Sequence, residues 1–281
     1  MRSLLTMFCT TLILLLGSTE GWSGDFQKGA DAYLKGDYAT ALREWDPLAN
    51  QGDAQAQFQL GWMYSKGEGV SEDDQEAVKW YRLAAEQRHA HAQYNLGLMY
   101  DSGWGVPKDD KEAVKWFRRA AEMGFAEAQH NLGVMYQKGR GVPENNQEAV
   151  KWYRRAAEQG AAAAQSNLGW MYANGKGVPE DDTEAVKWYA LAAAQGLAKA
   201  QHNLGLMYDN GEGVPKDDKE AVTWYRRAAE QGDVFAQNNL GFMYEYGEGV
   251  LQNYVIAHMW FNIASLKGHK KSKQNYEIIE K

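Results

Sequence analysis

The apolar and polar residues of this chain repeat with a fixed period. Each copy starts 36 residues after the one before, and the copies begin at Ala54, Ala90, Ala126, Ala162, Ala198 and Val234. In the third copy, Ala128, Leu132 and Tyr136 are four residues apart, which places them on one side of a helix. A second apolar stripe follows at Ala149, Trp152, Tyr153, Ala156 and Ala157. Each copy is therefore predicted to be two antiparallel helices.

Glycine and proline mark where the two predicted helices of a copy end and begin. Gly139 and Gly141 can take the positive φ that ends a helix, and Pro143 cannot continue one. An Asp or Asn then stands three residues before a Glu, in the pairs Asp73/Glu76, Asp109/Glu112, Asn145/Glu148, Asp181/Glu184 and Asp217/Glu220. This is the spacing of a capping box, in which each side chain satisfies a backbone N–H at the start of the second helix.

A further glycine recurs in the middle of the first helix, where it costs about 1 kcal/mol relative to alanine. It stands at Gly97, Gly133, Gly169, Gly205 and Gly241. We expect a close approach of the two helices at each of these glycines, because a side chain there would hold the helices apart.

The repeated residues resemble a known family. The pattern Ala-x-Ala-Gln-x-x-Leu-Gly-x-Met-Tyr, Gly-x-Gly-Val, Ala-Val-x-Trp-Tyr and Ala-Ala-x-x-Gly is similar to the Sel1-like repeat, a relative of the tetratricopeptide repeat. The resemblance implies an all-α fold, a right-handed α-α superhelical solenoid of helix-turn-helix repeats. Six copies cover 54–269, and 24–53 resembles a shorter, degenerate tetratricopeptide-like repeat. Residues 270–281 are expected to be a C-terminal capping segment.

The first 23 residues have the pattern of a cleavable signal peptide. Arg2 is followed by an apolar run from Leu4 to Leu16, which is too short for a membrane helix. We expect cleavage before Gly24, a periplasmic or secreted mature protein, and no membrane span after cleavage. Two alternatives remain open, an uncleaved N-terminal anchor and lipidation of Cys9, although Phe8 precedes that cysteine where a lipobox has a small residue. Cleavage would leave no cysteine and therefore no disulfide.

The composition and the motifs exclude several kinds of site. The formal net charge of -7 argues against nucleic acid as a partner, because phosphate binding needs a basic surface. The segments from Asp101 and Asp209 have the length of a calcium-binding loop, but glycine occupies its third and fifth positions, which should be ligands, and valine its sixth, which should be glycine. The histidines lack the spacing of a zinc site, and the chain contains no Ser-x-x-Lys. We therefore expect no metal, no cofactor and no catalytic residue.

A comparison of the copies separates unchanging positions from variable ones. The Leu at Leu132, the Tyr at Tyr136 and the Trp at Trp152 recur in all six copies and are expected to form the core. Other positions of the first helix vary, and in tetratricopeptide-like solenoids such positions face a concave groove. The resemblance thus implies a partner-binding surface made by Phe58, Trp62, His91, Tyr94, Leu98, His130, Trp170, His202, Leu206, Phe235 and Phe242. The competing interpretation is that Leu98, Val134 and Leu206 pack between repeats.

These features favour a non-enzymatic scaffold of the bacterial envelope, or a secreted one, that binds a protein partner along the groove. The bacterial setting is implied by the resemblance. A glycan- or peptidoglycan-binding module is the first alternative, since aromatic side chains also stack on sugars. A cell-wall-related enzyme with β-lactamase-like activity is the second, although no nucleophile assembly is visible. We expect a monomer.

Overall fold

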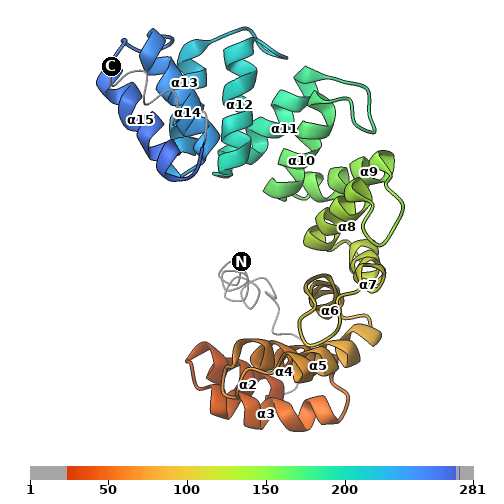
Figure 1. Cartoon of the computed structure of the whole chain (residues 1–281). Helices are drawn as coiled ribbons and strands as arrows, with labels where there is room; N and C mark the ends of the chain where they lie inside the picture. The colour runs from red at the N-terminus through yellow and green to blue at the C-terminus, as the bar shows by residue number, and fades with distance from the viewer. Residues whose placement is uncertain (1–23, 270–271, 273–281) are drawn as a thin grey trace. The chain divides into compact units, whose positions relative to one another are not determined.

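The computed structural model describes residues 24–269 and residue 272. This described part consists of fourteen α-helices joined by turns, with no β-strand in it (Figure 1). The expected all-α repeat fold is confirmed. The predicted signal peptide lies outside the described residues, and so does the predicted capping segment apart from Ser272.

The chain forms two compact units that divide after Arg119, inside α7 (Asp110–Glu122). The helices before α7 are α2 (Gly24–Leu34), α3 (Tyr38–Asn50), α4 (Ala54–Lys66), α5 (Asp74–Glu86) and α6 (Ala90–Ser102). Those after it are α8 (Ala126–Lys138), α9 (Asn146–Glu158), α10 (Ala162–Ala173), α11 (Asp182–Ala194), α12 (Ala198–Asn210), α13 (Asp218–Glu230), α14 (Val234–Tyr246) and α15 (Tyr254–Leu266).

Each 36-residue repeat contains one helix pair, and its positions can be numbered from the first residue of its first helix. Ala54, Ala90 and Ala126 thus all occupy position 1. The first helix of a pair is called helix A and spans positions 1 to 13, or 1 to 12 in α10; the second, helix B, begins at position 21. Leucine at position 7 is buried in all six repeats, so its expected place in the core is confirmed.

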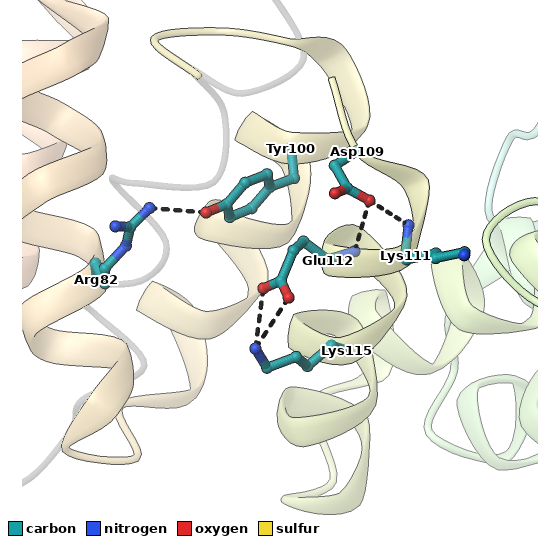
Figure 2. Close-up of polar contacts among 6 residues, drawn as sticks. All are labelled: Arg82, Tyr100, Asp109, Lys111, Glu112 and Lys115. Carbon is teal, nitrogen blue, oxygen red and sulfur yellow. Dashed lines mark hydrogen bonds and ion pairs between the residues drawn. The ribbon is translucent and has the colours of Figure 1, made fainter. Parts of the chain in front are cut away.

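The start of helix B is capped by one half of the predicted capping box. Figure 2 shows the carboxylate of Asp109 accepting hydrogen bonds from the backbone N–H groups of Lys111 and Glu112. The carboxylate of Glu112 pairs with Lys115, three residues on, at 3.0 Å. The other half of the capping box would be a bond from the backbone N–H of Asp109 to the side chain of Glu112. That prediction is wrong, because this N–H donates to the carbonyl of Tyr100 instead. That bond closes the glycine turn and uses the amide that the glutamate would have bound.

The mid-helix glycine at position 8 lies against an aromatic ring at position 28 on helix B. An added Cβ at Gly205 would lie 2.6 Å from the Cδ1 atom of Tyr225, far inside van der Waals contact. The same clash would occur at Gly133 with Tyr153 and at Gly241 with Phe261. The predicted close approach is therefore confirmed, and it explains why a residue that weakens a helix recurs there.

A buried glutamine at position 4 links each repeat to the helix before it. The Nε2 atom of Gln129 donates to the carbonyl of Ala121 at 3.1 Å, and Gln129 is almost fully buried. The equivalent bond is present in all six repeats, at Gln57, Gln93, Gln129, Gln165, Gln201 and Gln237. The carbonyl that it satisfies is one of those that the end of a helix leaves without an intrahelical partner.

A second glutamine, at position 34, satisfies the oxygen of the first in four repeats. Gln159 donates to Oε1 of Gln129 at 2.7 Å, and Gln87, Gln195 and Gln231 make the same bond. In the last repeat position 34 is Lys267, which donates to the carbonyl of Gly232. There, Oε1 of Gln237 is buried without a partner. Position 34 therefore completes a buried polar network only when it is glutamine.

The glycine contact predicts that Gly205→Ala destabilises the protein although alanine favours a helix. The ring of Tyr225 is buried and its hydroxyl is bonded to Asp209, so it cannot easily move away. Overpacking of this kind costs about 1–3 kcal/mol beyond the gain in helix propensity. Chemical denaturation would measure the loss. Lys199→Ala, at an exposed position of the same helix, should change stability by less than about 0.5 kcal/mol. Equal effects of the two changes would contradict the packing explanation.

The glutamine network predicts a cost for Gln159→Met, which keeps the length of the side chain but removes its N–H group. Oε1 of Gln129 would then be buried without a donor, at a cost of about 1–3 kcal/mol. Gln147→Met, on the exposed side of the same helix, is the control and should be nearly neutral. A denaturation midpoint that moves equally for both variants would show that the bond contributes little.

Candidate partner-binding surface

The variable side chains of helix A gather on one side of each helix. Positions 2, 5, 9 and 12 are three or four residues apart, so they share a face, which we call the helix A face. At position 5 the side chain lies against the ring at position 28 of the same repeat. The centroid distance is 5.9 Å for Tyr94 and Phe117, and 5.8 Å for His130 and Tyr153. The aromatic ring that fills the glycine contact thus also supports the face.

Two of the predicted surface residues are buried, and for them the prediction is wrong. Phe58 is only 2% exposed, and its ring stacks on His89 with a centroid distance of 4.7 Å. Trp62 is 5% exposed, and its indole N–H donates to the hydroxyl of Tyr33 in α2. The helix pair that precedes the first full repeat covers Trp62, so this indole stabilises the first unit and offers no surface to a partner.

The other predicted residues at position 9 are half-buried and pack mainly between helices. Trp170 contacts the apolar clusters on both sides of α10, and Leu206 packs against the cluster formed by α13 and α14. The ring of Phe242 is 5.1 Å from that of Phe261 in helix B of its own repeat. Leu98 is likewise half-buried. The competing interpretation holds for Leu206 and Val134, which pack between repeats.

Histidine and phenylalanine provide most of the accessible part of the predicted set. Phe235 is 57% exposed, and its ring lies 6.1 Å from that of His202 in the preceding repeat. His91, His130, His202 and Tyr94 are half-buried. His130 accepts at Nε2 from Asn167 of the next repeat, at 3.0 Å, while its Nδ1–H faces Asn131. Contacts of this kind join the helix A faces of neighbouring repeats within a unit into one surface.

Two polar sets also belong to this surface; the comparison of the copies counted position 12 among the variable positions but overlooked position 6. The first is an asparagine at position 6, present as Asn95, Asn131, Asn167, Asn203 and Asn239. The second is position 12, where Gln137 and Asp209 accept from the hydroxyls of Tyr153 and Tyr225. The recurring asparagine was a usable signal, because an uncharged polar residue is rarely kept in register without a bond to make.

Burial and the local bonds set the protonation of the titratable groups on the face. Burial lowers the pKa values of His91, His130 and His202, so these side chains are neutral near pH 7. It raises the pKa of Tyr153 well above its ordinary value. The face therefore combines neutral rings, amides and hydroxyls with a few charged side chains, among them Glu127, Lys199 and Asp209.

His89 has a specific role at the first helix of the second repeat. Its Nδ1 atom accepts from the backbone N–H of Ala92 and caps α6, and its Nε2 atom lies 2.9 Å from Oε1 of Gln55. Burial, with a smaller effect of nearby His91, lowers the pKa of His89 to about 4. Protonation would remove the cap and place a positive charge at the positive end of the helix.

The described residues contain no group of three His, Cys, Asp or Glu side chains placed to hold a metal ion. Within the same part of the chain, none of the helices combines the length and the apolar character that crossing a membrane requires.

Comparisons with known proteins agree with the repeat structure. The family model described as Sel1 repeat matches 54–89, 90–125, 126–160, 162–197, 198–233 and 234–269. A Sel1 repeat protein from Oxalobacter formigenes is 36% identical over 86% of this chain and 97% of that one, with a TM-score of 0.78. A protective antigen present in uropathogenic Escherichia coli strains, which displays an SLR fold, is 40% identical with a TM-score of 0.81. That alignment covers 85% of this chain but 51% of the antigen. The comparison with curated proteins finds no match.

The buried cap predicts a loss of stability in mild acid. The histidine of the unfolded chain has a pKa near 6.5, so between pH 6.5 and about 4 unfolding takes up a proton and becomes easier as the pH falls. By pH 5 this effect amounts to about 2 kcal/mol. His89→Asp keeps a cap of the type seen at Asp53 and Asp233 and should lack this loss. Unfolding curves of the original protein and of His89→Asp at pH 7 and pH 5 would measure this difference. Equal losses of stability in both proteins would contradict the assignment of the effect to His89.

Proposed function

This chain belongs to the Sel1 repeat family, and from that premise we propose that it is a non-enzymatic scaffold that holds a protein partner on the helix A face. Sel1 repeat proteins are generally protein-interaction scaffolds. The observation that carries the proposal is the contrast within each helix A. Positions 4, 7 and 8 are the same in all six repeats because they hold the helices together. Positions 2, 5, 9 and 12 change from repeat to repeat.

The chemistry of the face suits a protein surface. The exposed ring of Phe235 provides an apolar anchor of the kind that often dominates binding energy. The asparagines at position 6 and the polar groups at position 12 can bond to backbone or side-chain groups of a partner. Because the accessible side chains differ between repeats, such a face would distinguish one partner from another along its length.

We also propose that the mature protein acts outside the cytoplasm, in the periplasm or after secretion. The proposal rests on the charged start, the apolar run and the small residues of 1–23. The related Escherichia coli protein is described as a protective antigen, and antibodies protect by binding molecules that they can reach. That description supports an exported location for this chain as well.

Crosslinking in intact cells followed by mass spectrometry would identify the partner, whose binding can then be measured with purified variants. The test variant combines Tyr94→Ser and Phe235→Lys, which place on the face the residues that sibling repeats carry at Ser166 and Lys199. We expect at least about 100-fold weaker binding with unchanged helical content.

The matched control is Leu83→Ala with Leu191→Ala, two exposed apolar residues at position 30 of helix B. Their loss should leave the Kd within about threefold of the original. If the control variant lost binding and the helix A variant kept it, the partner would bind helix B and the proposal would be wrong.

A further inference from the structure

The last described helix B, α15, differs from its siblings on the side that faces solvent. Val255 at position 22 is 79% exposed, Met259 at position 26 is 45% exposed and Leu266 at position 33 is 81% exposed. In the five preceding repeats these positions carry mostly lysine, glutamine and glutamate. Exposed Leu251, in the turn before the helix, replaces the serine or proline of the siblings.

This apolar surface is not simply left open because no further repeat is described. Positions 22, 26 and 33 are exposed in each of the five earlier repeats, although another repeat follows every one of them. Stacking of repeats therefore never covers these positions. The side chains on α15 are apolar at places where the fold keeps side chains in water, and exposed apolar side chains gathered in one patch indicate an interface.

The spacing of the residues identifies the kind of occupant. Val255, Met259, Asn262 and Leu266 follow one another at intervals of four, three and four residues, which is the stripe that one helix presents to another. This order of intervals is the same in both directions along the helix. A second, antiparallel copy of α15 would therefore meet the stripe in register, with a two-fold axis between Met259 and Asn262.

The charge of the helix also suits a second copy. α15 contains no Asp, Glu, Lys or Arg, whereas every other described helix B contains charged residues. Burying charged side chains between two copies costs desolvation energy, and two copies of α15 can approach without that cost. Asn262 replaces an arginine or alanine of the siblings, and one polar residue within an apolar stripe can fix the register of a helix pair.

We propose that two copies of this chain associate through α15 as an antiparallel helix pair. Val255 of one copy then faces Leu266 of the other, and Leu251 extends the contact at both ends. A stable interface buries about 800 Å² on each partner, and this stripe supplies the apolar centre of such an area. The pair replaces the monomer expected from the sequence, and it uses helix B positions that are not part of the helix A face.

Light scattering during size-exclusion chromatography of the full chain, over a wide range of concentration, tests the proposal. The expected mass is that of two chains. The double variant Val255→Lys with Met259→Lys places lysine at positions 22 and 26 of α15, where the second repeat carries Lys111 and Lys115. The fold should therefore be kept. This variant should dissociate with a Kd at least about tenfold higher, at unchanged helical content. The control Thr183→Lys with Thr223→Lys adds the same charge at positions 22 and 26 of other repeats and should remain dimeric.

A single-chain mass at all concentrations would overturn the proposal, and so would a dimer that survives in the α15 variant. The antiparallel arrangement has its own test, in a Cys9→Ser background. A mixture of Val255→Cys and Leu266→Cys chains should form a disulfide between the two kinds of chain on mild oxidation. Disulfides that form only between chains of the same kind would contradict the arrangement. None of these outcomes depends on the partner bound by the helix A face.

Discussion

The contact between the mid-helix glycine and an aromatic ring sets the geometry of every described helix pair. Without a side chain at Gly205, helix A can rest directly on the ring of Tyr225. The ring is then fixed below helix A, where its hydroxyl meets Asp209 and its face supports His202. One small residue thus determines both the packing of the pair and the placement of side chains on the helix A face.

The buried glutamines carry this geometry from one repeat to the next. A glutamine such as Gln129 must place its amide against the carbonyl of Ala121, because a buried amide without a partner is costly. Apolar side chains alone would allow neighbouring helices to slide, whereas this bond admits one register. The tyrosine hydroxyls at position 11 add a weaker link near the surface, as Figure 2 shows for Arg82 and Tyr100.

Local features of the fold could be predicted from the sequence, whereas features that depend on neighbouring helices could not. The period, the turns and the close approach at Gly205 follow from residue types and spacing. The burial of Trp62 does not, since it depends on a tyrosine in the preceding helix pair. The side chain of Glu112 was misassigned because the amide that it could bind is already bonded to the carbonyl of Tyr100. For the candidate surface, variability could not separate exposed Phe235 from buried Phe58, because burial depends on the helices that pack around each side chain.

We propose that the helix A face, rather than helix B, binds a protein partner. Site-specific photocrosslinking in living cells tests it most directly, with a photoreactive amino acid placed at Phe235, at His91 or at Lys151 on helix B. We expect the same crosslinked partner from Phe235 and His91 and none from Lys151. A partner captured from Lys151 alone would contradict it.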